Sequence, residues 1–428
     1  MHTFKNFKNF AEAEIDLSKP MTILIGRNGS GKSNIIEGIE LLSELLKGRD
    51  LHEIFDVGRD GDFEIRGGLN SCSRQGYSSF EIGFKDTVFF EQKEQNINYQ
   101  VSVNLEPTLQ VNKQAMVDGK NLLDQIPVLN NYSDNDALLL MALIAGLGLF
   151  SSENKNISKL GIGVLLLTAF SAINKNQTKS YKEQLDPELL LKKYTDTFVF
   201  DIYPRAMREY SQIGENQLSK NGAKLSSVLF YLKNNAPDTL EKILNRIKQL
   251  PEEEFESFEF ITTSDNSDVL FALKYPNGEQ ISAKLLSDGT LRALAILTAL
   301  ETVPEGSRIL IEEIDNGVHA SRVNILIEAI WEASHRRHLK TLMTTHNPAT
   351  LDSLKDEQLA CVVVCHYDKE SQSAKLTPLL ELPRADAFLE MEGLGSAVTH
   401  NIIEQHLIPD YEKQQRKNTL AWLESLND

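Results

Sequence analysis

Cysteine is scarce in this chain of 428 residues. The 3 cysteines, Cys72, Cys361 and Cys365, are too few for a disulfide framework and show no metal-ligand spacing. Cys361 and Cys365 lie in an apolar run at 360–365 that predicts a buried strand, so we expect them to pack in a reducing compartment. The cysteine count therefore argues against a small disulfide-stabilised domain and against a cysteine-based metal site.

Long hydrophobic runs are also missing. The longest uncharged apolar stretches, 137–150 and 160–173, are shorter than the ~20 residues that a membrane helix needs. We interpret both as core helices of an inserted lobe and expect no membrane contact. The N-terminal segment lacks the apolar core of a signal peptide, which favours a cytoplasmic protein.

Positive charge is in short supply as well. Lys and Arg number 44 against 61 Asp and Glu, and the net charge of −17 argues against a broadly basic surface. Nucleic acid would need a local basic patch, and the segment Ser-His-Arg-Arg-His-Leu-Lys at 334–340 is the obvious one. A solvated helix end explains that segment about as well.

A glycine-rich loop organises the rest of the chain. Residues 26–33 read Gly-Arg-Asn-Gly-Ser-Gly-Lys-Ser, which fits the phosphate-binding loop pattern. The apolar run before it, at 21–25, predicts a buried strand, and apolar residues at helical spacing over 35–46 predict a helix after it. Lys32 would reach the β- and γ-phosphates of ATP, and Ser33 would hold Mg²⁺. The nucleotide-binding loop would be completed by Gly26, Arg27, Asn28, Gly29, Ser30, Gly31 and Asn34.

Three later segments carry groups that suit ATP hydrolysis. A strand predicted at 308–311 ends in Glu312 and Glu313, which we assign to the metal and to the attacking water. A strand predicted at 341–345 ends at His346, which could sense the γ-phosphate or hold the water. A helix predicted at 291–300 is preceded by Ser287, Asp288 and Gly289, which would form a second anion site. Taken singly, each segment also has a simpler interpretation, as solvated acids, a structural histidine and an ordinary helix cap.

Other patterns outline the remaining architecture. Apolar alternation over 79–105 predicts an antiparallel β subdomain around 63–120, and 4–17 suits an early strand pair. Pro276-Asn277-Gly278 between two strand-like runs predicts a hairpin. Residues 122–250 are mostly helical by pattern, with a short strand at 198–202. We expect a first part of the head over 1–121, a helical insertion over 122–250, a second part of the head over 251–366, and an extension completing it over 367–428.

Taken together, the motifs resemble those of ABC-type ATPases. The order of phosphate loop, signature at 286–290, Glu312-Glu313 and His346 matches that family, and the long gap before the signature is similar to the RecF/SMC/OLD branch. Within this branch, Ser-Asp-Gly-Thr at 287–290 resembles compact prokaryotic ATPases assigned to the AAA class, many of them in anti-phage defence systems such as Septu and PARIS. The resemblance implies an α/β fold: a head with a mixed, mainly parallel core sheet, an antiparallel β subdomain and a helical insertion.

The resemblance also implies that two heads sandwich two ATP molecules. Ser287 and Gly289 would then act on the γ-phosphate held by the partner's loop, so a homodimer or higher homo-oligomer is expected. Asp315 and Asn316 would lie at the dimer interface, with His319 close by.

Two departures from the family pattern concern the metal and the Q-loop. Glu312 stands where an aspartate is usual, and its extra methylene predicts slow hydrolysis. No secure Q-loop glutamine is present, and Gln75 and the region of Arg66 are the candidates.

These inferences describe an ATPase with ATP and Mg²⁺ as cofactors, in which Lys32, Glu313 and His346 carry the chemistry. It would act as a sensor or switch subunit that controls a separate effector, for example a nuclease, in anti-phage defence. The segment after His346 shows no acidic cluster of a TOPRIM nuclease, so we expect none in this chain. Two alternatives stay open: a RecF-like repair ATPase that binds DNA, and a scaffold that binds ATP without hydrolysing it.

Overall fold

The computed structural model describes residues 1–47, 65–90, 93–121, 193–250, 255–385 and 393–407, together with a few isolated positions between these ranges. The apolar runs at 137–150 and 160–173 lie outside the described residues, as does the end of the extension expected over 367–428. Within the described ranges, no helix combines the length and the apolar character needed to cross a membrane.

The core of the molecule is a 6-stranded sheet with the order β16-β15-β3-β14-β13-β8. Every neighbouring pair is parallel except β15 and β16, so the predicted mixed, mainly parallel sheet is confirmed. The bounds of its strands are β3 Met21–Ile25, β8 Thr197–Phe200, β13 Arg308–Ile311, β14 Lys340–Thr344, β15 Val362–Asp368 and β16 Ser373–Pro378. All residues of β3 and β13 are buried, because layers cover both faces of the sheet.

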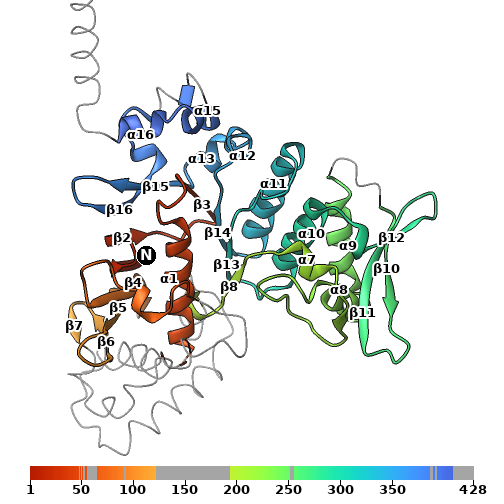
Figure 1. Cartoon of the computed structure of the whole chain (residues 1–428), viewed down its shortest axis with the longest axis horizontal. Coiled ribbons are helices and arrows are strands. Elements are labelled where there is room, and N and C mark those ends of the chain that lie inside the picture. The colour runs from red at the N-terminus through yellow and green to blue at the C-terminus, as the bar shows by residue number, and fades with distance from the viewer. Residues whose placement is uncertain are drawn as a thin grey trace, which may run out of the picture.

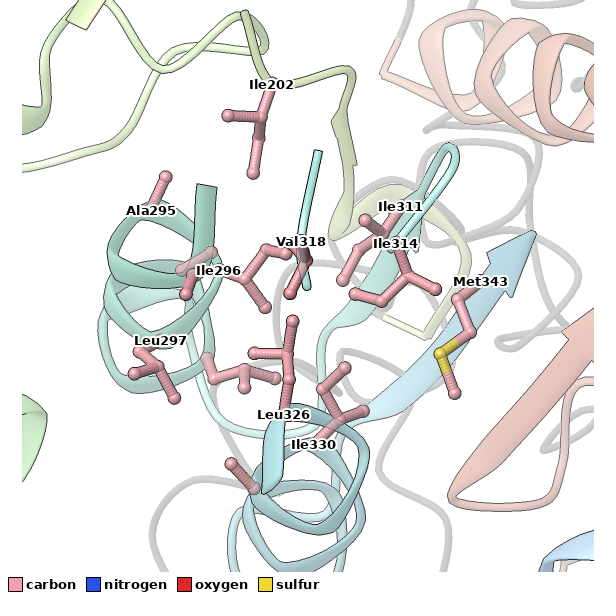
Figure 2. Close-up of a cluster of buried hydrophobic side chains, with 14 of the residues drawn as sticks. Ile202, Ala295, Ile296, Leu297, Ile311, Ile314, Val318, Leu326, Ile330 and Met343 are labelled. Atoms are coloured by element: carbon pink, nitrogen blue, oxygen red, sulfur yellow. The ribbon is translucent and has the colours of Figure 1, made fainter. Parts of the chain in front are cut away.

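This sheet separates two hydrophobic cores. Successive side chains of a strand point to opposite faces, so Ile309 and Ile311 of β13 belong to one core and Leu310 to the other. Helices α10 (Asp288–Thr302) and α11 (Ala320–Arg336) cover the first face, where Figure 2 shows Ala295 and Ile330 around the side chain cluster of Ile311. Helix α1 (Lys32–Leu46) lies on the second face, as Figure 1 shows.

An antiparallel sheet covers α1 from the other side and confirms the predicted β subdomain. Its order is β2-β1-β4-β5-β6-β7. Gly38 of α1 approaches β1 so closely that a Cβ atom there would lie 2.4 Å from the Phe4 ring. The strands are β1 His2–Phe7, β2 Phe10–Ile15, β4 Ser79–Phe90, β5 Lys93–Asn104, β6 Gln110–Val117 and β7 Lys120–Asn121.

A smaller sheet and several helices extend the first face, on the side of α10 away from α1 (Figure 1). The predicted hairpin is confirmed, since β11 and β12 pair antiparallel around the Asn277-Gly278 turn, where Gly278 has φ 85°. The strands are β9 Ser211–Gln212, β10 Ser257–Thr262, β11 Asp268–Lys274 and β12 Gln280–Ser282. The remaining helices are α7 Pro204–Met207, α8 Leu225–Asn235, α9 Pro237–Ile247, α12 Pro348–Asp352, α13 Asp356–Leu359, α15 Leu394–Thr399 and α16 Ile402–His406.

The helical insertion expected over 122–250 needs a correction at its C-terminal side. Strand β8 lies in that range, yet Phe200 pairs with Ile311 in the core sheet. Helices α8 and α9 share the hydrophobic core of α10. Residues from β8 onward therefore belong to the head, and 122–192 lie outside the described residues. Strand β8 has only 4 residues, so its sequence pattern is weak. Its place in the sheet depends on pairing with β13, which lies far away in the sequence.

Candidate functional site

The candidate site lies at one edge of the core sheet. Strands β3, β14 and β13 are parallel neighbours, so the segments that follow their C-terminal ends meet there. The glycine-rich loop 26–33 follows β3, His346 comes just after β14, and Glu312 and Glu313 follow β13. Strand β8 adds Asp201, which the sequence patterns did not single out.

The loop 26–33 has the backbone that its glycines predict. Gly26, Gly29 and Gly31 have φ angles of 145°, 80° and 117°, which side-chain-bearing residues rarely adopt. At Gly26 a Cβ atom would lie 2.1 Å from the Cys365 carbonyl oxygen, whereas at Gly29 no atom lies within 4 Å of that position. The loop is therefore packed against β15 at its start and open at Gly29.

Polar groups converge on this loop. Lys32 Nζ donates to the carbonyl oxygens of Gly26 at 2.6 Å and Arg27 at 3.2 Å. Burial lowers the pKa of Lys32, while Cys365 and Glu313 oppose this shift. The hydroxyl of Ser30 is buried and has no hydrogen-bond partner in the described part of the chain. An open, donor-rich loop at the start of α1 fits the phosphates of a nucleotide.

Two residues that sequence reasoning missed support the loop from outside. Asn9, in the turn between β1 and β2, donates to the Ser30 carbonyl at 3.0 Å and accepts from Asn34 Nδ2 at 2.8 Å. Cys365 Sγ donates to the same carbonyl at 3.2 Å. Burial raises the pKa of the Cys365 thiol to about 11, so it is neutral and inert near pH 7. The predicted strand at 360–365 was a usable signal for Cys365, and nothing local marked Asn9.

Glu312 meets the loop directly. The Ser33 hydroxyl donates to Glu312 Oε2 at 3.0 Å, so the two residues assigned to the metal lie together. Burial raises the pKa of Glu312, the Ser33 bond and the Arg66 charge oppose this shift, and Asp201 adds to it. These hard oxygen groups suit Mg²⁺, which commonly takes one or two carboxylates together with substrate phosphates. The extra methylene of Glu312 still allows contact with Ser33.

Glu313 is exposed and held in an unusual conformation. Its φ of 47° lies in the left-handed region, which is uncommon outside glycine. Its amide donates to Thr344 Oγ1 at 2.9 Å, and Asn316 Nδ2 donates to its Oε2 at 3.0 Å. The carboxylate is therefore held in front of the sheet edge. His346 is exposed at the same edge.

Buried acids of α1 form a second layer behind the loop. Lys220 Nζ, another residue that the sequence patterns missed, donates to both oxygens of Glu40, at 2.9 and 2.8 Å. Arg66 donates to Glu37, and its charge also acts on Glu312. Of the two Q-loop candidates, Arg66 thus reaches this network, whereas Gln75 lies in an exposed turn.

The signature segment 286–290 lies at the start of helix α10. Ser287 caps α10 by accepting from the Thr290 amide at 3.1 Å, and Asp288 accepts from Arg208 Nη2 at 2.6 Å. A Cβ atom on Gly289 would lie 2.7 Å from the Gly317 carbonyl oxygen. In the described residues, the hydrogen bonds of Ser287 and Asp288 run to Thr290 of α10 and to Arg208, the residue after α7, rather than to the loop 26–33.

The expected position of Asp315 is wrong. Its side chain is only 5% exposed and accepts from the hydroxyls of Thr345 and Thr350, so it faces the interior. A buried carboxylate needs donors, and the turn after β14 provides them. Asn316 and His319 are exposed, and His319 Nδ1 accepts from the Ser321 amide at 3.3 Å.

The basic segment 334–340 is engaged inside the chain. Arg336 pairs with Glu301, and Arg337 Nη2 donates to the Val303 carbonyl at 2.6 Å. Lys340 donates to the Ser18 carbonyl. These contacts favour the interpretation as an end of a packed helix over a free basic patch.

Comparison with known proteins identifies the family of this chain. A family model described as "AAA domain, putative AbiEii toxin, Type IV TA system" matches residues 21–137 and 165–352, more than half of the chain. An "ATP/GTP phosphatase" of Helicobacter pylori is 21% identical over 370 residues, covering 82% of this chain and 85% of that protein. The "DNA replication and repair protein RecF" of Picosynechococcus sp. is 34% identical over 78 residues, 18% of this chain and 19% of RecF.

Among solved structures, an SMC head bound to the C-terminal winged-helix domain of ScpA covers 88% of this chain and 96% of that chain. Its TM-score is 0.46 and its sequence identity 15%. The family match spans the phosphate loop, the signature, both glutamates and His346. The chain therefore belongs to the AAA-domain ATPase family described as "putative AbiEii toxin, Type IV TA system", and the ATPase family predicted from its motifs is confirmed.

Proposed function

We propose that this protein hydrolyses ATP slowly with Mg²⁺ at a site that a second copy completes, and that the resulting assembly switches a separate effector. The observation that carries the proposal is the hydrogen bond between Ser33 and Glu312, beside a glycine loop that opens at Gly29. This contact supports the assignment of Ser33 and Glu312 as the metal ligands beside the loop that would hold the phosphates. The Helicobacter pylori relative named as an ATP/GTP phosphatase supports hydrolysis.

Each site residue has a task that its contacts allow. Lys32 would exchange the loop carbonyls for phosphate oxygens, and Ser33 with Glu312 would hold Mg²⁺, which neutralises phosphate charge when bound. Glu313 would accept a proton from the attacking water, because Asn316 and Thr344 hold it at the exposed edge. His346 would orient that water or contact the γ-phosphate.

The second copy is needed for the signature. Ser287 and Asp288 are exposed at the start of α10, on the first face of the core sheet, while α1 lies on the second. A partner head would present Ser287 to the γ-phosphate, whereas Gly289 is buried in this structure. ATP would then favour the closed pair, which is the kind of population shift that an effector can read.

The setting we propose is defence against phage. The family description names toxin–antitoxin systems, which supports a role in a conflict system with a partner gene. We expect the neighbouring reading frame to encode an effector such as a nuclease. A DNA-repair operon there would instead favour the RecF-like alternative, in which DNA stimulates turnover.

Glu313→Gln tests the central assignment. The amide cannot take a proton from water, so steady-state phosphate release should fall by about 100-fold or more. ATP should stay bound, and the ATP-bound protein should elute as a stable dimer or larger assembly in light-scattering chromatography. Glu370→Gln, an exposed glutamate far along the chain, serves as the matched control and should behave as wild type.

Two results would count against the proposal. Unchanged turnover and unchanged assembly in Glu313→Gln would remove the catalytic assignment. Phosphate release that persists in Lys32→Ala would come from a contaminant. If the wild-type protein releases no phosphate, the non-hydrolysing scaffold is favoured.

A further inference from the structure

A cavity of about 530 Å³ lies at the opposite edge of the core sheet from the nucleotide site. Its lining includes residues from four places in the chain: His2 of β1, Asp86 of β4, Tyr194 just before β8, and Arg308 at the start of β13. Arg308 begins β13 and Glu312 follows its end, so the two are about 13 Å apart along the strand. A volume of this size falls within the range of small-molecule sites.

Arg308 is a buried cation without a carboxylate partner. Its side chain is only 2% exposed, and no ion pair to it occurs among the described residues. The guanidinium lies 5.1 Å from the Tyr194 ring centre, and its Nε–H has no acceptor among the described residues. Burial lowers the pKa of Arg308 to about 10, which leaves it charged at neutral pH. An unpaired buried charge is costly, so the position calls for an acceptor.

The acids around the cavity are already engaged. Asp86 Oδ2 accepts from Lys193 Nζ at 2.6 Å and from Tyr194 Oη at 2.9 Å. Asp16 accepts from the amide and the hydroxyl of Ser18, both at 2.9 Å. Lys340 pairs in register with Arg308, so a second cation lies beside the guanidinium. Arg308 and Lys340 are thus not paired with these acids, and the charge that they leave at this end of the sheet is positive.

His2 adds a second unpaired donor. Its Nε2 lies 3.3 Å from Arg308 Nη1, and because a guanidinium can only donate, Nε2 must accept. Burial and the Arg308 charge keep the pKa of His2 well below its usual value, so the ring is neutral and its proton sits on Nδ1. That Nδ1–H is buried without an acceptor in the described part of the chain. Both orphaned groups are therefore donors.

We propose that this cavity binds a small organic anion, whose carboxylate or phosphate group accepts hydrogen bonds from Arg308 and His2. The buried side chains of Leu17 and Ile97 line the same cavity and would cover the apolar part of the ligand. The site is separate from the loop 26–33, which lies at the other end of β3 and β13. It is nonetheless joined by β13 to Glu312.

Thermal unfolding of the full chain tests this site, with sodium phosphate and sodium succinate as probes against sodium chloride at equal ionic strength. The experiment uses the Lys32→Ala background, so that phosphate cannot report on the loop. At least one probe should raise Tm by about 2–4 °C, and which one does so distinguishes phosphate from carboxylate ligands. Arg308→Met, which keeps the volume and removes the charge, should abolish that shift, whereas the exposed control Arg205→Met should keep it.

Absence of a shift with both probes, or a shift that survives Arg308→Met, would overturn the proposal. If Arg308→Met shows no cooperative unfolding, His2→Phe takes its place. It removes one donor and should raise the half-saturating probe concentration about tenfold. An unchanged half-saturating concentration would equally overturn the proposal.

Discussion

The Asp315 carboxylate ties together the turn that presents Glu313. It accepts from Thr345 and Thr350, so it links the segment after β13 to the end of β14 and to α12. Two further hydrogen bonds hold the same turn. The Glu313 amide donates to the Thr344 hydroxyl, and the Ile314 amide donates to the Thr344 carbonyl at 3.1 Å. A left-handed residue such as Glu313 persists only where its surroundings fix it. We infer that Asp315 positions Glu313, the glutamate that we propose as the catalytic base, rather than touching a partner.

Asp315→Ala should therefore lower both stability and turnover. Two buried hydroxyls lose a charged acceptor, which should cost about 2–3 kcal/mol in the free energy of unfolding measured by urea titration. Steady-state phosphate release should fall because Glu313 is no longer held. Asp315→Asn keeps one acceptor oxygen and should recover part of both losses. Full stability in Asp315→Ala would show that these bonds contribute little.

At the scale of an element, α1 combines an apolar stripe with buried acids. Its helix follows the spacing of Ile35, Ile39 and Leu42, which face the second core. Glu37, Glu40 and Glu44 of the same helix are also buried, each less than 10% exposed. Lys220 and Arg66 reach them from distant segments. The helix that carries the phosphate loop is thus fixed partly by charge pairs.

Stability should depend on pH through Glu40. Burial raises the pKa of Glu40 to about 7 from the ordinary 4.5, although Lys220 opposes this shift. Between these values the native state holds more protons than the unfolded chain, so stability should fall as pH rises from 4.5 to 7. The Glu40→Gln variant has no carboxyl group to titrate at this position. It should therefore lose the decrease of about 1–3 kcal/mol in the free energy of unfolding across that window, measured by urea unfolding. The exposed Glu241→Gln should keep it.

Elements defined by local patterns could be predicted from the sequence. The loop 26–33 with its strand and helix, the Asn277-Gly278 hairpin and the strand ending in Glu312 each carry their signal within a short window. The direction of Asp315 could not be predicted, because it lies in a turn without periodicity and its donors come from another strand.

The missed residues of the candidate site share a physical cause. Asp201 joins the edge because Phe200 pairs with Ile311, and Lys220 meets Glu40 across 180 residues of sequence. Neither contact leaves a local pattern, because each is created by the packing of the head.

At the scale of the whole molecule, the signature and the phosphate loop are carried by helices on opposite faces of the core sheet. The loop opens the helix that packs on the second face, and Ser287 opens the helix that packs on the first (Figure 1). Ser287 is exposed, as are Arg27, Asn28 and Gly29 of the loop, whereas Lys32 at the start of α1 is half-buried. A second copy of the head is the partner that we propose would supply Ser287 to the phosphates held by this loop.

Ser287→Arg should separate ATP binding from ATP-driven assembly. The loop around Lys32 is untouched, so nucleotide affinity in titration calorimetry should stay within about threefold, while assembly and phosphate release should disappear because the bulky side chain blocks the partner's phosphate. Loss of the helix cap would itself cost about 1 kcal/mol, so Ser287→Asp provides the matched variant. Aspartate keeps the cap but repels the phosphate, and it should abolish assembly equally. The exposed Ser264→Arg should assemble as wild type, and an ATP-dependent dimer in both Ser287 variants would mean that each head completes its own site.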